Sequence, residues 1–87
     1  MRTIRLSGRE ASVVKAIGFA EAVLGADIQD LTRMELEDVT DVLNSLISAG
    51  FVESIPHAEQ VDLADLPAMQ FEVNPAYAHQ LKDAIIR

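Results

Sequence analysis

The sequence contains no cysteine and no tryptophan, and its aromatic side chains are those of three phenylalanines and one tyrosine. Without cysteine, the chain forms no disulfide, offers no thiolate nucleophile and binds no metal through sulfur. No uninterrupted apolar segment approaches about 20 residues, the length that spans a bilayer. The N-terminal arginines are not followed by the apolar region of a secretory signal. These absences predict a soluble, intracellular protein of the cytoplasm.

Basic residues are scarce after the first 15 positions. Four of the seven lie within those positions, namely Arg2, Arg5, Arg9 and Lys15. Between Asp27 and Glu72, Arg33 is the one basic residue against eleven acidic ones, so that segment carries a net charge of −10 within a chain of −7. Such a field repels nucleic acid and anionic membranes and attracts basic partners. A solvated surface that keeps the protein soluble explains most of the same charges equally well.

The length predicts one domain over residues 1–87. A chain of this size buries about 60–65% of its unfolded surface, and its hydrophobic fraction of 49% is sufficient for an independent core. The sequence shows no internal repeat, no linker and no low-complexity segment.

An amphipathic helix is predicted between residues 36 and 48, because apolar side chains recur there at three- and four-residue steps. This apolar stripe comprises Leu36, Val39, Leu43, Leu46 and Ile47. Gly50 follows as a helix stop, and Phe51 and Val52 begin an extended segment. The opposite face is acidic and polar and carries Glu37, Asp41, Asn44 and Ser48, with Glu35 and Asp38 beside it.

The N-terminal part of the chain predicts a short edge strand over residues 3–6 and then a long first helix. Ser7 and Glu10 have the spacing of a capping box. The helix is expected to run from residue 8 to residue 24 and to be closed by Gly25. Its main stripe is predicted to comprise Val13, Ile17, Ala20 and Leu24.

The expected helix over residues 8–24 is apolar almost all round. Its second side carries small residues flanked by larger apolar ones, namely Ala11, Gly18, Phe19, Ala22 and Val23. A helix of this kind is buried on more than one side. The second side is covered either by the C-terminal helix or by another subunit, so these five residues form a predicted homodimer face.

The segment between the first and third helices predicts a short second helix. Asp27 is its expected cap, and the helix is expected over residues 28–32. Thr32 and Glu35 have the spacing of a second capping box. The third helix is therefore expected to begin between residues 33 and 36.

A β-hairpin and a final helix complete the predicted order. Residues 51–55 and 69–73 are expected strands joined by a long acidic loop over residues 56–67. Asn74 followed by Pro75 is typical of a helix start, with asparagine as the cap. The inner stripe of that helix is predicted to comprise Tyr77, Leu81, Ala84 and Ile85.

This order resembles the winged helix-turn-helix superfamily over nearly the whole chain: mainly α, with a three-helix core, a small β-hairpin wing and a C-terminal helix. The most specific part is Val39-x3-Leu43-x2-Leu46-x3-Gly50-Phe51-Val52. It is similar to the end of the recognition helix in MarR- and ArsR-like regulators. The resemblance implies a fold more than a function, because many such domains bind protein or only dimerise.

Members of that superfamily that read DNA do so from the first turns of the third helix. The matching positions here are Glu35, Glu37, Asp38, Thr40, Asp41 and Asn44. Protein–DNA affinity depends largely on phosphates neutralised by lysine and arginine, and these positions are mostly acidic. Acidic residues in the first turn of a helix are also favoured by its dipole alone, by about 0.3–1 kcal/mol each.

The leading hypothesis is a regulatory, homodimeric module that docks a basic protein partner on Glu35, Glu37, Asp38, Asp41 and Asn44. The alternative is a DNA-binding transcriptional regulator. Its phosphate and base contacts are Arg2, Arg5, Arg9, Thr40 and Asn44.

No catalytic, cofactor or metal site is expected. The glycines are dispersed, so no phosphate-binding loop exists. His57 with Glu59, Asp62 and Asp65 is a weak candidate for a divalent ion, and a solvated loop is the preferred interpretation. The chain is therefore predicted not to be an enzyme.

Overall fold

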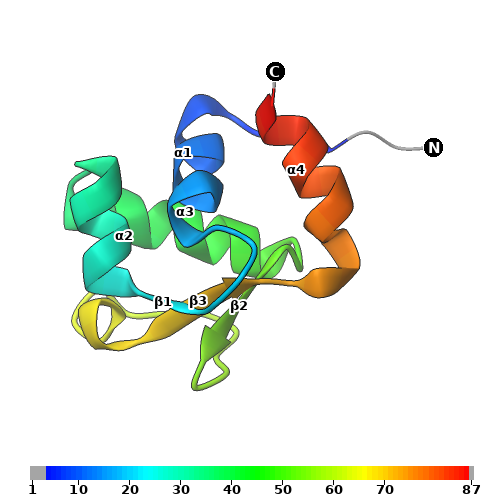
Figure 1. Ribbon diagram of the computed structural model, residues 1–87. Coiled ribbons are helices and arrows are strands. Elements are labelled where there is room, and N and C mark those ends of the chain that lie inside the picture. The colour runs from blue at the N-terminus through cyan, green and yellow to red at the C-terminus, as the bar shows by residue number, and fades with distance from the viewer. Residues whose placement is uncertain (1–3, 87) are drawn as a thin grey trace.

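The computed structural model describes residues 4–86, and in that range the chain forms four α-helices and three β-strands. One short strand lies between the first two helices, and the other two strands lie between the third and fourth helices (Figure 1). The elements are α1 Gly8–Ile17, β1 Val23–Leu24, α2 Gly25–Thr32, α3 Leu36–Ser48, β2 Val52–Ile55, β3 Gln70–Val73 and α4 Ala78–Ile86. Two 3-10 turns, Leu66–Ala68 and Pro75–Tyr77, flank β3.

The three strands form one antiparallel sheet in the order β1-β3-β2. Val52 is paired with Val73, and Phe71 is paired with both Val23 and Ser54. Residues directly opposite each other project to the same face, and of these five all but Val23 are buried. The helices lie on this side of the sheet (Figure 1). The hairpin and the alternation of β3 are therefore confirmed.

The core lies where α1 and α3 meet the inner face of the sheet. It is built almost entirely from aliphatic side chains, with Phe71 as its largest member. The fully buried set is Val13, Val14, Ile28, Val39, Leu43, Leu66, Phe71 and Leu81. The predicted stripe of α3 is confirmed in its three central positions, whereas Leu36 and Ile47 are partly buried at its margin.

The capping box at the start of α1 is confirmed. The Glu10 backbone N–H donates to the Ser7 hydroxyl over 3.2 Å, and the Ser7 N–H donates to the Glu10 carboxylate over 2.8 Å. The expected strand before it is not formed, since residues 4–7 are irregular; Thr3 lies outside the described residues.

The predicted end of the first helix is wrong. The helix stops at Ile17, and Gly18 follows with φ 73°. Residues 19–22 are irregular, and the chain then enters β1. Gly25 starts α2 instead of closing α1, and its N–H donates to the Met69 carbonyl over 2.8 Å. Pairing with β3 satisfies backbone groups that a continuing helix would have satisfied internally. Ala20 and Leu24 of the predicted stripe are consequently exposed.

The predicted caps of the second and third helices are also wrong. α2 begins at Gly25, before Asp27, and its N-cap residue makes no side-chain hydrogen bond. The Thr32 hydroxyl donates back to the Ile28 carbonyl over 2.8 Å. Thr32 is therefore engaged with the last turn of α2 and does not cap α3, and Glu35 is the N-cap of α3 without a side-chain bond. The start of α3 at Leu36 is within the predicted interval.

α3 ends in two interlocked backbone hydrogen bonds. The Phe51 N–H donates to the Leu46 carbonyl and the Gly50 N–H to the Ile47 carbonyl, each over 3.0 Å. Gly50 has φ 85°, so the pattern is that of a Schellman motif. The prediction that Gly50 stops the helix is confirmed.

Replacing Gly50 with valine is expected to destabilise the fold by about 1–2 kcal/mol, because a β-branched side chain is strained at positive φ. Asparagine tolerates this conformation better, so Gly50→Asn is the matched control and is expected to lose less. Urea denaturation of the three proteins measures the difference. Equal stabilities for the valine variant and the parent would contradict the assignment.

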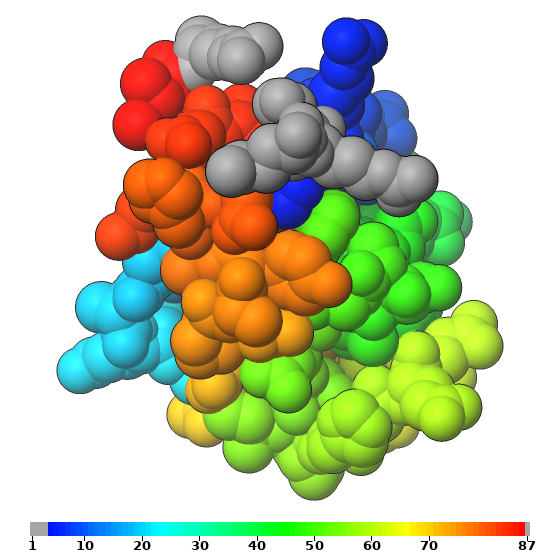
Figure 2. Space-filling model, turned by 90° about the vertical axis from the view of Figure 1, so that its right-hand side faces the viewer, coloured from blue at the N-terminus to red at the C-terminus, as the bar shows by residue number. Residues whose placement is uncertain are grey.

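Asn74 joins the end of α3 to the start of the C-terminal segment. Its side-chain oxygen accepts from the Ala76 N–H over 3.0 Å, as predicted for a cap, and its amide donates to the Gly50 carbonyl over 2.9 Å. It caps the 3-10 turn that leads into α4. In Figure 2 the turn and α4 cover the middle of one face, between residues 18–22 and α3. Leu81 is the buried residue of the predicted α4 stripe, and Tyr77 remains exposed.

Candidate functional site

The most distinctive exposed surface is one face of α3. At 100° per residue, four exposed positions fall within a quarter turn, and they are Glu37, Asp41, Ser45 and Ser48. With a rise of about 1.5 Å per residue, this row extends about 16 Å along the helix. Glu35 is exposed at the N-cap, and Asp38 is half-buried beside the row. The negative charge is concentrated at the N-terminal half of this surface.

Among the described residues, Asp38 is the one carboxylate of this surface that has a basic partner. Its Oδ1 lies 3.4 Å from the Arg9 guanidinium of α1, and the side chains of Arg9 and Asp38 are 67% and 37% exposed. Exposed pairs of this type contribute little to stability. Arg33 is exposed at the end of α2 and forms no ion pair within residues 4–86. Glu37 and Asp41 therefore keep their charges available to a partner.

Two polar residues predicted to face a partner are used inside the fold. Thr40 is 7% exposed, and its hydroxyl donates to the Leu36 carbonyl over 2.7 Å. The Asn44 side-chain amide donates to the Val61 carbonyl over 3.0 Å and accepts from the Val61 N–H over 2.7 Å. The assignment of Thr40 and Asn44 to base or phosphate contact, and of Asn44 to the docking face, is corrected accordingly.

The Asn44 contacts reshape the loop between β2 and β3, which was predicted to be solvated. Val61 and Leu66 are buried, and Ser54 accepts from the Ala58 N–H over 2.8 Å at the start of the loop. Residues 56–69 therefore fold back against α3 and α2 instead of extending into solvent. Leu63 remains exposed and is the largest exposed apolar residue of the loop.

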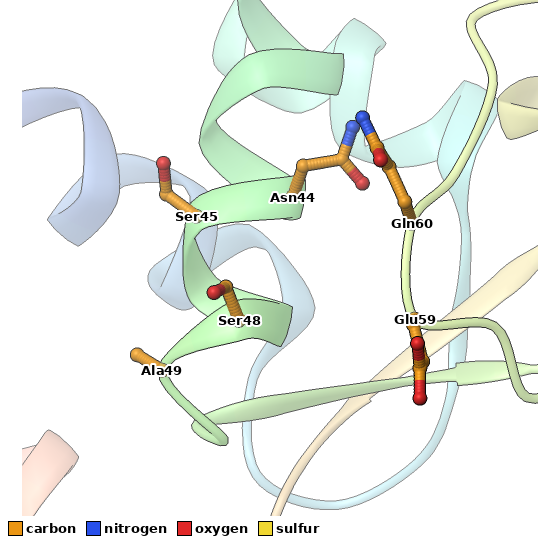
Figure 3. Close-up of a pocket in the computed structure, with 6 residues that line it drawn as sticks. All are labelled: Asn44, Ser45, Ser48, Ala49, Glu59 and Gln60. Carbon is orange, nitrogen blue, oxygen red and sulfur yellow. The ribbon is translucent and has the colours of Figure 1, made fainter.

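A polar hollow lies between α3 and this loop (Figure 3). α3 contributes Asn44, Ser45 and Ser48, its C-cap residue Ala49 follows them, and the loop contributes Glu59 and Gln60. In Figure 3 the amides of Asn44 and Gln60 point toward each other across the upper part of the hollow. The hollow continues the exposed row of α3 and offers hydroxyl and amide groups. Sequence spacing did not predict it, because the position of the loop depends on tertiary contacts, among them the hydrogen bonds between Asn44 and Val61.

The predicted anion contacts are not gathered on one face. Arg9 is paired with Asp38 near α3, whereas Arg5 and Lys15 border a hollow between residues 4–8 and α4. Arg2 lies outside the described residues. With Thr40 and Asn44 engaged internally, the described members of this set do not make a continuous surface for a duplex.

The predicted dimer face is not one helix face. Of its members, Ala11 belongs to α1, Gly18 is the cap, Phe19 and Ala22 lie in the irregular segment, and Val23 is in β1. Phe19 is partly buried against the core. The prediction of self-association thereby loses the feature on which it rested.

Among residues 4–86, no three histidine, aspartate or glutamate side chains are close enough together to hold a metal ion. His57, Glu59, Asp62 and Asp65 are exposed along the 56–69 loop without forming such a group. In the same part of the chain, every helix is too short or too polar to cross a bilayer.

Comparisons with protein-family models, with curated proteins and with solved structures found no match to this chain.

Proposed function

We propose that the chain is a winged helix-turn-helix module that works in regulation by docking a basic protein segment on the exposed face of α3. Support for the fold comes from the element order and from the sheet order β1-β3-β2. In this assignment α2 and α3 are the helix-turn-helix, β2 and β3 with their loop are the wing, and α3 occupies the position of the recognition helix.

One observation carries the choice of partner. On α3 the carboxylates are exposed, whereas the uncharged polar side chains Thr40 and Asn44 are hydrogen-bonded within the fold. Glu37 and Asp41 point outward, while Thr40 and Asn44 are engaged in internal hydrogen bonds. A duplex would bring phosphates toward unpaired carboxylates and would find no lysine or arginine on this helix to offset them. A lysine- or arginine-rich segment would instead neutralise these carboxylates.

The partner is expected to present cations one helical turn apart. Glu37 and Asp41 are separated by four residues, which is about 6 Å along the helix axis. A second helix with basic residues at matching intervals would place one cation against each carboxylate. Exposed ion pairs contribute about 0.2–1 kcal/mol each, so binding through this face is expected to be moderate and dependent on salt.

Reversing both charges is expected to weaken binding of an arginine-rich helical peptide about tenfold, because two attractions become repulsions and each tenfold corresponds to about 1.4 kcal/mol. The variant is Glu37→Lys with Asp41→Lys, measured by fluorescence anisotropy with arginines four residues apart in the peptide.

The matched control for that titration is Glu21→Lys with Asp65→Lys. Both residues are exposed and lie outside α3, and the net charge changes by the same amount. This control is expected to change the affinity by less than the α3 variant does. Equal losses in the two double variants would show attraction by the overall field only and would contradict a docking face on α3.

A further inference from the structure

The outer face of the sheet carries two glutamates directly opposite each other. Glu53 of β2 is paired with Glu72 of β3 in the antiparallel register. Like charges at directly opposite positions destabilise a strand pair. Neither carboxylate forms an ion pair with a basic side chain among residues 4–86. The pair is thus an unfavourable arrangement for which the described chain contains no compensating contact.

A row of three exposed side chains, the outer two of them apolar, lies next to this pair on the same face. Gln70 is paired with Leu24 on one side and with Ile55 on the other, so the three side chains form one row across the sheet. Leu24 is 39% exposed and Ile55 is 42% exposed. With strands about 4.8 Å apart and a rise of about 3.3 Å per residue, the row is about 10 Å long and about 7 Å from the glutamate pair.

We infer that this outer sheet face, defined as Leu24, Glu53, Ile55, Gln70 and Glu72, is a second docking surface for a short arginine-containing segment of another protein. A guanidinium has five donors in a planar fork and bridges two carboxylates better than an ammonium group does. Apolar side chains flanking that arginine cover Leu24 and Ile55. Binding thereby replaces the repulsion between Glu53 and Glu72 with two charge-assisted contacts.

The charges also oppose a symmetric dimer formed through this face. Packing two of these faces together would place four glutamates in one interface without a basic residue from the sheet, and unpaired buried charges oppose association. The surface is distinct from the exposed face of α3, because α3 lies on the opposite side of the sheet (Figure 1). The inference is therefore independent of the function proposed for α3.

The test uses the full chain labelled with ¹⁵N and a peptide with one central arginine flanked by leucines. The matched peptide carries citrulline, which keeps the shape and removes the charge. The arginine peptide is expected to shift the amide signals of residues 23–24, 53–55 and 70–72, and the citrulline peptide is expected to bind at least fivefold more weakly. Glu53→Gln and Glu72→Gln are each expected to weaken binding of the arginine peptide by at least fivefold.

Glu59→Gln is the control, since it removes one exposed carboxylate from the 56–69 loop and is expected to leave binding unchanged within twofold. Glu72→Gln is also expected to raise the urea midpoint, whereas Glu59→Gln is not. Absence of binding, equal binding of the two peptides, or an equal loss in Glu59→Gln overturns the inference. Signal shifts confined to α3 overturn it as well, while leaving the proposal for α3 supported.

Discussion

Gly25→Ala is expected to destabilise the folded protein by about 3 kcal/mol, at the upper end of the usual cost of overpacking. A Cβ at this position would overlap the Leu66 carbonyl oxygen and would lie 2.7 Å from Leu66 Cδ2 and 2.8 Å from the Leu66 carbonyl carbon. The backbone on both sides is fixed, because the Gly25 N–H donates to the Met69 carbonyl over 2.8 Å. Relief therefore requires α2 and the 56–69 loop to separate.

The control for this variant is Gly8→Ala. Gly8 is also the first residue of its helix, and a Cβ there has no atom within 4 Å. Alanine lowers the conformational entropy of the unfolded chain, so this control is expected to be neutral or stabilising by up to about 1 kcal/mol. Urea denaturation of both variants tests the packing. A Gly25→Ala protein as stable as Gly8→Ala would show that α2 and the loop are not in contact at this point.

Asn44→Ala is expected to cost about 2 kcal/mol. It removes both hydrogen bonds to Val61 and leaves the Val61 N–H and carbonyl without their partner beside a buried side chain. The loop is also expected to become sensitive to limited proteolysis. Ser45→Ala, at the next and exposed position of the helix, is the control and is expected to change stability by less than about 0.5 kcal/mol.

The variant Asn44→Asp distinguishes the contributions of the two hydrogen bonds. An aspartate still accepts from the Val61 N–H but cannot donate to the Val61 carbonyl, so it is expected to be destabilising as well. If Asn44→Ala and Asn44→Asp unfolded at the same urea concentration as the parent protein, Asn44 would be a free surface residue. Asn44 would then again be assigned to the predicted docking face.

The segments predicted well are those whose structure is determined locally. α3 has an apolar repeat, a terminating glycine and a strand directly after it, and each of these signals lies within a few residues of the element that it defines. Ser7 with Glu10 and Asn74 with Ala76 are likewise short-range contacts. Such contacts depend on side-chain chemistry and spacing that are visible in the sequence.

Apart from the misplaced caps of α2 and α3, the errors concern contacts between residues distant in the sequence. The apolar pattern of α1 continues past Gly18, but the helix ends there with Gly18 at φ 73°, and Val23 pairs with Phe71 in the sheet. Tertiary pairing of this kind overrides local helix preference. Asn44 is similar, since its position on a polar helix face gave no indication that Val61 would be its partner. The single helix face assumed for the predicted dimer contacts, and the free side chains assumed for the predicted base contacts Thr40 and Asn44, were wrong for these two reasons.

The sequence correctly placed the carboxylates of α3 on an exposed helix face. It did not show which of these carboxylates already have a basic partner within the chain. Arg9 reaches Asp38 from α1, a contact between two helices that the sequence did not predict. Glu37 and Asp41 remain exposed, and they carry the proposal that α3 binds a basic segment.

The most direct test of that proposal is a titration of the unmodified protein into labelled random-sequence duplex DNA and, in parallel, into the arginine-rich helical peptide, both at low ionic strength. Fluorescence anisotropy is expected to show saturable binding to the peptide, weakened by added salt, and no saturable binding to the duplex. Saturable binding to the duplex with no binding to the peptide would contradict the account and would favour a DNA-binding regulator.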